Sequence, residues 1–237
     1  MDKISNAISA LCDKKFVLIY DADNRERETD MVMCAEFVDY ENVRTMRKDG
    51  GGLICVTLIS EVRKKIGLPF LTELFERNRA FYPVLRYASA TDIPYDTKSA
   101  FSVTINHRNT FTGITDRDRA LTISEFGKFV NLACHNDNRT ELLEYFGKRF
   151  RTPGHVHILN AAKNLIDERA GHTELATVLM IMANLTPCAA IVEMLDCDGN
   201  ALSKTKAIEY SQKNGLVFLE GETIVHAWKR FKTMETV

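Results

Sequence analysis

Apolar residues in this chain follow two spacings, and short segments of each kind alternate from one end to the other. Near the start, Ile4, Ala7, Ile8 and Leu11 recur every three or four positions, which predicts an amphipathic helix. The continuous apolar run at 16–20 has the length of a strand and is followed at once by acidic residues, so it predicts a buried strand. Both patterns return repeatedly downstream.

The later segments are assigned on the same grounds. Further strands are expected at residues 31–38, 53–59, 101–105, 189–195 and 216–219. Further helices are expected at residues 41–48, 60–66, 122–133, 156–165, 174–185, 204–214 and 222–231. Because helices and strands interleave without an internal repeat or a linker rich in Pro, Gly and Ser, we expect one layered domain over residues 1–237. The hairpin-like succession of the first strands predicts a mixed sheet.

Glycines and polar residues mark the boundaries between these elements. Three glycines at 50–52 lead into the strand at 53–59 and permit backbone angles that other residues avoid. Thr122 and Glu125 have the spacing of a capping box, which predicts that a helix begins there. The polar stretch at 135–139 predicts a loop, and it is where we expect an insertion.

Composition narrows the class of protein. The chain has 237 residues, 45% of them apolar and 27% charged, which is typical of a folded globular domain. Lys and Arg total 31 against 32 Asp and Glu, and the resulting net charge of −1 provides no overall attraction to nucleic acid or to an anionic membrane. No apolar run approaches the ~20 residues of a membrane span or resembles a signal peptide, so a cytoplasmic location is expected.

Cysteine and glycine patterns exclude several common sites. The six cysteines, at positions 12, 34, 55, 134, 188 and 197, form no C-x-x-C pair. This argues against a zinc knuckle and a disulfide framework, and it predicts free thiols that are mostly buried. The chain lacks G-x-G-x-x-G after its first strand and G-x-x-x-x-G-K-[ST] throughout, which removes the usual dinucleotide and P-loop sites.

The densest group of charges lies at 21–30, directly after the first strand, and contains five acids and two arginines. If this stretch is extended, Glu26, Glu28 and Asp30 place their carboxylates on one face, which suits a hard divalent cation. Arg25 could then meet an anionic ligand beside them. The alternative is a solvated charged loop, which is the ordinary explanation of a charge run.

A second candidate is His155. Pro153 and Gly154 predict a turn immediately before it, and basic residues precede it at 148, 149 and 151. A histidine can carry protons near neutral pH. Alternatively, His155 caps the following helix or donates to a buried carbonyl.

A third candidate lies at 168–174, where Arg169, Gly171, His172 and Thr173 lead into an apolar helix. Backbone N–H groups at a helix start, together with a guanidinium and a hydroxyl, make a competent phosphate site. An ordinary helix start is the alternative.

Taken together, these motifs resemble 3,4-dihydroxy-2-butanone 4-phosphate synthase, an enzyme of riboflavin biosynthesis. Taken singly, Cys55 and Glu193 are better explained as ordinary strand residues, and residues 112–115 as a turn. The motifs occur in the family's order between about residues 16 and 221: Asp21, Arg25-Glu26-x-Glu28-x-Asp30, Gly51-Gly-Leu-Ile-Cys55, Thr112-Gly-Ile-Thr115, Pro153-Gly-His155, Gly171-His-Thr-Glu174 and Glu193. The length suggests the stand-alone form of the enzyme, and the 135–144 stretch looks longer than is typical.

The resemblance implies an α+β fold, a single three-layer domain with a mixed, twisted β-sheet flanked by helices. It implies a lyase dependent on Mg²⁺ or Mn²⁺, with two divalent ions when substrate is bound, that converts D-ribulose 5-phosphate into L-3,4-dihydroxybutan-2-one 4-phosphate and formate. The implied reaction proceeds through a metal-stabilised enediolate, dehydration and a skeletal rearrangement. It also implies a homodimer with active sites at the subunit interface, and no nucleic-acid or membrane partner is expected.

Roles for individual residues also follow from the resemblance. Glu26 and His172 are implied to be the metal ligands. Substrate contacts are implied for Arg25, Glu26, Asp30, Thr112, Arg169, Ala170, Gly171, His172, Thr173 and Glu193. His155 and Glu193 match the family's catalytic pair. We add the hypothesis that Glu193 and either Glu28 or Asp30 exchange protons with the sugar carbons, while His155 and Cys55 assist from the opposite side.

Two other classes of function stay open from the residues alone. A metal-dependent sugar-phosphate isomerase or aldolase would use the same kinds of side chain, and formate release separates it from the lyase. A binding module for a ligand or nucleic acid is suggested by the basic groups at 25–27 and 149–151, but these lie among acids and the net charge opposes it.

Overall fold

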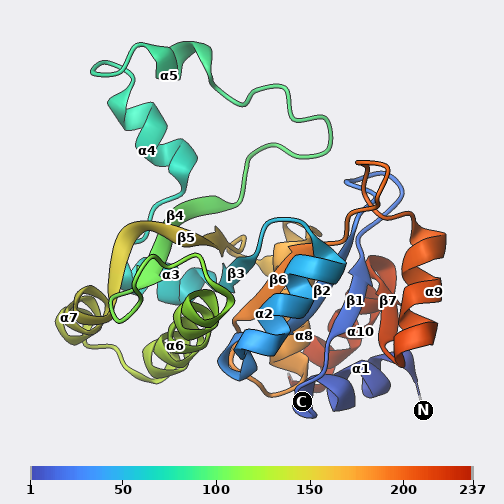
Figure 1. Cartoon of the computed structure of the whole chain (residues 1–237). Coiled ribbons are helices and arrows are strands. Elements are labelled where there is room, and N and C mark those ends of the chain that lie inside the picture. The colour runs from blue at the N-terminus through green and yellow to red at the C-terminus, as the bar shows by residue number, and fades with distance from the viewer. Residues whose placement is uncertain (1, 236–237) are drawn as a thin grey trace.

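The chain folds around a seven-stranded mixed β-sheet (Figure 1). The computed structural model describes residues 2–235. Its strands are β1 (Val17–Tyr20), β2 (Thr29–Cys34), β3 (Cys55–Leu58), β4 (Phe101–His107), β5 (Phe150–Asn160), β6 (Ala189–Glu193) and β7 (Val217–Glu220). Their order is β4-β5-β3-β6-β2-β1-β7. β1 with β7 and β3 with β5 are parallel pairs, and the other neighbours are antiparallel.

Helices cover both faces of this sheet. They are α1 (Lys3–Cys12), α2 (Tyr40–Thr45), α3 (Ser60–Ile66), α4 (Leu71–Asn78), α5 (Val84–Tyr87), α6 (Asp116–His135), α7 (Arg139–Arg149), α8 (His172–Met182), α9 (Lys204–Asn214) and α10 (Gly221–Glu235). α2, α3, α6 and α7 contribute to the apolar core on one face, and α1, α8 and α10 to the core on the other. The predicted three-layer α+β arrangement is therefore confirmed.

Strand side chains alternate between the two cores. In β1, for example, Leu18 packs in the core to which α6 contributes, whereas its neighbours Val17 and Ile19 pack in the core to which α8 contributes. Successive residues of a strand point to opposite faces, so a strand covered on both sides must be apolar at every position. This explains why the run at 16–20 showed no alternation in the sequence.

One predicted helix is wrong. We expected a helix at 156–165, but those residues begin within β5 and continue into a loop and the short turn Leu165–Asp167. Val156 and Ile158 are both buried and alternate with His157, which is the spacing of a strand. A short apolar run fits the spacing of a helix as well as that of a strand, and here pairing with β3 and β4 makes it a strand. The same strand contains Pro153 and Gly154, so the predicted turn before His155 is also wrong.

The predicted capping box at Thr122 is wrong as well. α6 begins six residues earlier, where Thr115 accepts a hydrogen bond from the N–H of Asp118 (3.1 Å). Thr122 is buried inside the helix, and its hydroxyl accepts from the N–H of His107 (2.9 Å). The loop expected at 135–139 is shortened because α7, which we did not predict, begins at Arg139.

Other boundaries differ slightly. The strand expected at 31–38 covers Thr29–Cys34 and is followed by a helical turn at Ala35–Phe37, and the helix expected at 41–48 ends in a π-turn, Met46–Gly50. All six cysteines are free, as predicted, but only three of them are buried (Cys34, Cys55 and Cys188). Within residues 2–235, none of the helices combines the length and apolar character that crossing a bilayer requires.

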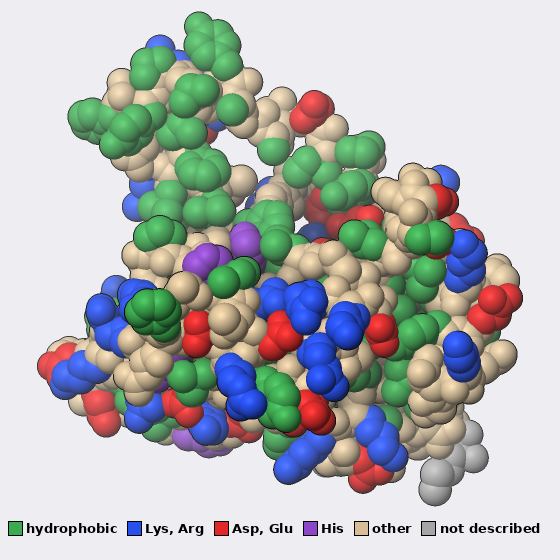
Figure 2. Space-filling model, in the orientation of Figure 1, with side chains coloured by type: hydrophobic (Ala, Val, Ile, Leu, Met, Phe, Trp, Pro, Cys, Tyr) green, Lys and Arg blue, Asp and Glu red, His purple; other side chains and the backbone are tan. Residues whose placement is uncertain are grey.

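Residues 71–99 form an arm that projects from the sheet and helices (Figure 1). The arm carries α4 and α5 and returns to the sheet at β4. Its outer part exposes large apolar side chains, including Phe81 (78% exposed) and Tyr87 (90%). Figure 2 shows hydrophobic side chains gathered on the projecting part of the molecule. The arm is thus the segment that projects from the rest of the molecule.

Candidate active site

The acidic stretch after β1 is folded into a loop by its own first carboxylate. Asp21 is buried, and its two oxygens accept hydrogen bonds from the backbone N–H groups of Glu26 (2.9 Å) and Glu28 (3.2 Å). The N–H of Asp21 donates in turn to the carbonyl of Glu28 (3.2 Å). An aspartate that bonds backbone groups a few residues onward stabilises a local turn. The loop therefore holds Glu26 and Glu28 at the end of β1.

His172, the first residue of α8, meets this loop from a distant part of the chain. Its Nδ1 lies 3.0 Å from the Glu26 carboxylate, and its Nε2 lies 3.2 Å from the carbonyl oxygens of both Ile19 and Glu28. Because a carbonyl oxygen only accepts, Nε2 is the nitrogen that carries a proton, and in the neutral ring the lone pair of Nδ1 faces Glu26. Metal-binding histidines are commonly oriented in this way, with one nitrogen donating to an acceptor and the other available as a ligand.

The charges around His172 compensate one another. Burial by itself would lower the pKa of His172, but the nearby carboxylates of Asp30, Glu26 and Asp21 raise it to about 10. Burial would likewise raise the pKa of Glu26, but its hydrogen bond to His172 and the charge of that ring keep it below its usual value. The imidazolium thus supplies the positive charge that these acids require. A divalent cation can supply the same charge once the ring has lost its proton.

Three further carboxylates crowd beside this pair. The register of β2 and β6 places Asp30 directly opposite Glu193, and Glu28 lies next to them. Burial, followed by the charges of Glu26 and Glu193, raises the pKa of Glu28. Burial raises the pKa of Asp30 well above its usual value despite the opposing charge of His172. The Oδ1 atom of Asp30 is buried without a hydrogen-bond partner. Carboxylates this close need a proton or a cation to offset their repulsion.

This donor set fits a divalent cation. One ligand atom from each of Asp21, Glu26 and His172 lies within 4.8 Å of the others. Both oxygens of Asp21 already accept backbone N–H groups, whereas Glu26 and Nδ1 of His172 face each other. The geometry therefore favours Glu26 and His172 as ligands, with Asp21 holding the loop. Oxygen donors and only two protein ligands suit an ion such as Mg²⁺, which retains water and substrate oxygens.

Glu193 packs against the glycine-rich turn before β3. Its Oε2 accepts from the N–H of Leu53 (2.7 Å), and its backbone carbonyl accepts from the N–H of Gly52 (3.0 Å). A Cβ atom at Gly52 would lie 2.3 Å from Oε2 of Glu193. Gly51 has the positive φ of 95° that the sequence suggested for this turn. Gly52 is required because the Glu193 side chain approaches its backbone closely.

We predict that Gly52→Ala lowers the free energy of unfolding by about 1–3 kcal/mol, because overpacking forces the Glu193 side chain away from Leu53. Denaturant unfolding measures the change. The matched control is Gly147→Ala in α7, where an added Cβ meets nothing within 4 Å and alanine favours the helix. A Gly52→Ala protein as stable as the wild type would contradict the close contact.

Arg169 forms the basic side of the site. Its Nε donates to Asp96 (2.5 Å), and its Nη1 donates to the buried Glu174 (2.6 Å). Glu174 also accepts from the N–H of Ala162 (2.8 Å). A Cβ at Gly171 would lie 2.3 Å from Nη1 of Arg169, so glycine at this position lets the guanidinium cross the start of α8. Arg25 reaches the same Asp96 with Nη2 at 3.3 Å.

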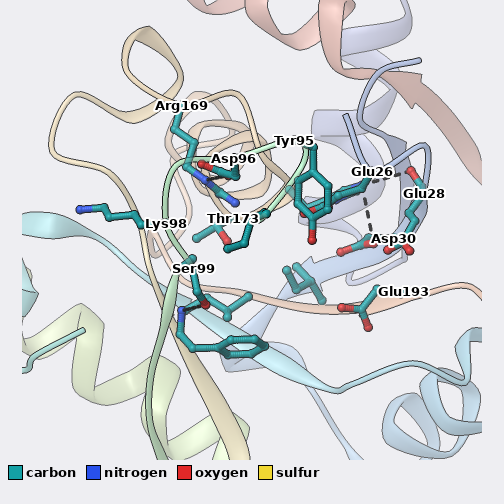
Figure 3. A pocket seen from close by; sticks show the side chains of 16 residues that line it. Glu26, Glu28, Asp30, Tyr95, Asp96, Lys98, Ser99, Arg169, Thr173 and Glu193 are labelled. Atoms are coloured by element: carbon teal, nitrogen blue, oxygen red, sulfur yellow. Dashed lines mark hydrogen bonds and ion pairs between the residues drawn. The ribbon is translucent and has the colours of Figure 1, made fainter. Parts of the chain in front are cut away.

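These groups surround one cavity of about 280 Å³ (Figure 3). Figure 3 shows the carboxylates of Glu26, Glu28, Asp30 and Glu193 on one side, with Arg169 and Asp96 on the other. The predicted site residues that line the cavity are Glu26, Glu28, Asp30, Arg169, His172, Thr173 and Glu193. The predicted site residues that do not line it are Arg25, Cys55, Thr112, His155, Ala170 and Gly171. The cavity therefore brings together the acidic motif at 21–30 and the motif at 168–174 that contains Arg169.

Cys55 lies next to the floor of the cavity. In β3 it pairs with Ile191 of β6, and Ile191 lines the cavity. Burial raises the pKa of the Cys55 thiol well above its usual value, and the charges of Glu193 and Asp30 raise it further. Cys55 therefore carries a protonated thiol beneath the carboxylates rather than a reactive thiolate.

His155 and Thr112 belong to a separate cluster centred on Asn106. The N–H of His155 donates to Oδ1 of Asn106 (2.9 Å), and Nδ1 of His155 lies 3.1 Å from Nδ2 of Asn106. Nδ2 of Asn106 also donates to the carbonyl of Thr112 (3.3 Å). Gly113 and Gly154 enclose this asparagine so closely that a Cβ at Gly113 would lie 2.0 Å from it. His155 and Glu193, which the resemblance implies act together, therefore lie in different places within one chain. His155 belongs to the Asn106 cluster, and Glu193 lines the cavity.

Part of the site was not predicted from the sequence. Tyr95, Asp96, Lys98 and Ser99, at the base of the arm, line the cavity, and the hydroxyl of Tyr95 points into it (Figure 3). This stretch lies in the irregular middle of the chain, where the sequence shows neither a periodic pattern nor a motif that we identified. The only signal is a tyrosine and charged residues in a loop, which is where binding residues often occur.

Comparison with known proteins gives a consistent result. The family model of 3,4-dihydroxy-2-butanone 4-phosphate synthase matches residues 5–227. A protein of that name from Methanothermobacter thermautotrophicus is 47% identical over 231 residues, which cover 97% of this chain and 97% of the relative. One from Archaeoglobus fulgidus is 46% identical over 221 residues, covering 92% and 91%. A solved structure of 3,4-dihydroxy-2-butanone 4-phosphate synthase with two magnesium ions has a TM-score of 0.76 and 25% identity, covering 98% of this chain and 99% of that one.

Proposed function

We propose, because the chain belongs to the 3,4-dihydroxy-2-butanone 4-phosphate synthase family, that it converts D-ribulose 5-phosphate into L-3,4-dihydroxybutan-2-one 4-phosphate and formate. The family assigns the chain to riboflavin biosynthesis, and the substrate and products are our proposal. One observation carries it: Glu26 and Nδ1 of His172, 146 positions apart in the chain, lie 3.0 Å from each other in a cavity that also holds Arg169. A cytoplasmic location stays a prediction from the sequence.

The proposed cofactor is Mg²⁺ or Mn²⁺, with two ions when substrate is bound. Support comes from the buried Oδ1 of Asp30, which has no hydrogen-bond partner and lies 3.6 Å from Nε2 of His172, and from the oxygen-rich donor set around Glu26 and His172. The related solved structure contains two magnesium ions. A bound divalent cation would polarise the ketose oxygens and stabilise the negative charge that develops on them. Glu26 and His172 would hold it.

The chain's own carboxylates would move the protons. Glu28 and Asp30 have pKa values raised by burial and by neighbouring acids, so each can retain or release a proton closer to neutral pH than an exposed carboxylate. Glu193 is positioned beside them by its hydrogen bond from Leu53. We propose that these three exchange protons with the sugar carbons. Cys55, buried beneath them, is proposed to assist.

The phosphate end of the substrate would lie at the start of α8. The proposed contacts are the backbone at 169–173, including Ala170 and Gly171, the Arg169 guanidinium and the Thr173 hydroxyl, with Arg25 nearby. Thr173 and Arg169 line the cavity, and the first backbone N–H groups of α8 are directed toward its N-terminus. The cavity would then hold the sugar between the carboxylates and the phosphate subsite.

We further propose a homodimer in which each subunit completes the site of the other. His155 and Thr112 belong to the Asn106 cluster and do not line the cavity of their own chain, which supports a contribution from a second copy. In this arrangement His155 assists catalysis and Thr112 contacts substrate across the interface.

One assay tests the proposed function. The purified chain is incubated with D-ribulose 5-phosphate and Mg²⁺, and formate is measured before and after a chelator is added. We expect formate that depends on the cation and returns when metal is restored. Consumption of the ketose without formate would instead support a sugar-phosphate isomerase or aldolase.

For Arg169→Ala we predict a higher Michaelis constant with a smaller change in turnover number. Loss of a charge-assisted hydrogen bond costs ~1.5–3 kcal/mol, which corresponds to roughly a ten- to hundredfold change in affinity. Steady-state kinetics separate the two parameters. Arg149→Ala is the control, because Arg149 pairs with Glu125 and does not line the cavity. An unchanged Michaelis constant for Arg169→Ala would contradict the phosphate assignment.

We also predict that added metal reverses inhibition by acid. Glu26 and His172 must be deprotonated to bind a cation, so protons compete with it and activity falls as the pH falls. If one proton competes, a tenfold higher metal concentration should move the acid midpoint down by about one pH unit. Activity profiles at two Mg²⁺ concentrations measure this shift. A midpoint that does not depend on metal would contradict the assigned ligands.

A further inference from the structure

The arm contributes a carboxylate to the basic side of the cavity. Asp96 uses a single oxygen, Oδ2, to contact Nε of Arg169 (2.5 Å) and Nη2 of Arg25 (3.3 Å). Its other oxygen accepts the N–H of the following residue, Thr97 (2.8 Å). Figure 3 shows Asp96 directly against the Arg169 guanidinium, within the cavity wall. One carboxylate therefore links two arginines that lie far apart in the sequence.

These contacts occupy one donor atom on each arginine that an incoming anion could use. Nη1 of Arg169 is committed to Glu174, which is buried and also bonded to the backbone of Ala162. Nε of Arg169 and Nη2 of Arg25 are the donors that Asp96 occupies, one on each guanidinium. Because a guanidinium has a fixed set of N–H donors, a phosphate cannot take these positions while Asp96 holds them.

The local charge keeps Asp96 in place. Burial opposes its ionisation, but the charge and hydrogen bond of Arg169 hold the pKa of Asp96 below its usual value. Its side chain is only 8% exposed, whereas Pro94, Tyr95 and Thr97 around it are exposed. A buried, paired side chain on an otherwise exposed stretch anchors that stretch. Asp96 therefore fastens the base of the arm to the two arginines.

We propose that Asp96 is an internal competitor for the phosphate subsite, which the phosphate of the substrate displaces when it binds to Arg25 and Arg169. This inference rests on the proposed function for the identity of the anion. A phosphate monoester carries about −1.5 to −2 charges at neutral pH, more than one carboxylate, so it can exchange with Asp96. A neutral ketose offers no anion and leaves Asp96 in place. Asp96 thereby makes the site selective for a phosphorylated sugar and couples anion binding to release of the arm at 93–99.

The experiment uses inorganic phosphate as the probe and the full chain. Calorimetry compares its dissociation constant for the wild type, Asp96→Asn and Asp92→Asn. Asp92 is an exposed carboxylate on the same arm, so its substitution makes the same change of charge away from the arginines. If Asp96 occupies the subsite about nine-tenths of the time, removing its charge should tighten phosphate binding about tenfold, because the binding-competent fraction rises to nearly one. Asp92→Asn should bind phosphate as the wild type does.

A second readout follows the arm in the wild-type protein. Amide hydrogen exchange at 93–99 should rise when phosphate is added and stay unchanged with ribulose, which lacks the phosphate. The inference is overturned if Asp96→Asn binds phosphate no more tightly than Asp92→Asn, or if phosphate leaves exchange at 93–99 unchanged or lower. Neither measurement requires turnover. A chain that released no formate would therefore contradict the proposed function and leave this result standing.

Discussion

Glu26→Gln should reduce formate release by about a thousandfold or more while the protein stays folded. The amide keeps the size of the side chain but loses the charge that binds a cation beside Nδ1 of His172. A site with two protein ligands has none to spare. A thousandfold loss corresponds to about 4 kcal/mol of transition-state stabilisation that the cation no longer supplies. His172→Asn should have a similar effect. Formate release, circular dichroism and calorimetric binding of Mn²⁺ together separate lost chemistry from lost structure.

The surface offers a matched control for this substitution. Glu222 and His226 form another Glu–His pair, with 3.4 Å between carboxylate and ring, but it is exposed on α10. Glu222→Gln removes the same charge from the same kind of pair, and we expect wild-type turnover and metal affinity. A Glu26→Gln enzyme that keeps its activity, or one that still binds Mn²⁺ as tightly as the wild type, would contradict the assignment of Glu26 as a ligand.

Mixing two inactive variants should restore activity. Glu26→Gln damages the cavity, and His155→Asn damages the Asn106 cluster, so each homodimer has two defective sites. In a heterodimer with shared sites, one site combines an intact cavity with an intact histidine from the other subunit. Random exchange makes half the dimers mixed, each with one of two sites working, so activity should recover to about a quarter of the wild-type value.

The complementation has a built-in control. Mixing Glu26→Gln with His172→Asn should restore nothing, because both substitutions damage the same cavity and no arrangement of the two chains contains an intact one. Sedimentation or light scattering confirms that subunits exchange. The shared site would be contradicted if subunits exchange but the first mixture recovers no activity. An active chain that stays monomeric would also contradict it.

The sequence predicted the sheet more successfully than the boundaries of its irregular parts. The apolar runs of β1, β3 and β6 are buried on both faces, so their hydrophobicity alone identifies them. β5 was mistaken for a helix because Val156, Ile158 and Leu159 fit both periods, and its neighbours in the sheet come from distant segments. Local pattern cannot contain that information.

The acidic half of the site was predictable for a physical reason. Glu26, Glu28 and Asp30 are close in sequence, and their crowding is costly unless a ligand compensates it, so the cluster stands out. Its contact with His172 across 146 positions was implied by the family resemblance and not by spacing. The contributions of Tyr95 and Asp96 were missed for two reasons. The stretch that contains them shows no periodic pattern, and only the three-dimensional course of the arm brings it to the cavity.

The central claim is that Glu26 and His172 hold one divalent cation. It is tested most directly by diffraction from crystals grown with Mn²⁺, using its anomalous signal to locate the metal. We predict a peak within coordination distance of both the Glu26 carboxylate and Nδ1 of His172. Manganese bound elsewhere, with these two side chains still in contact only with each other, would contradict the account.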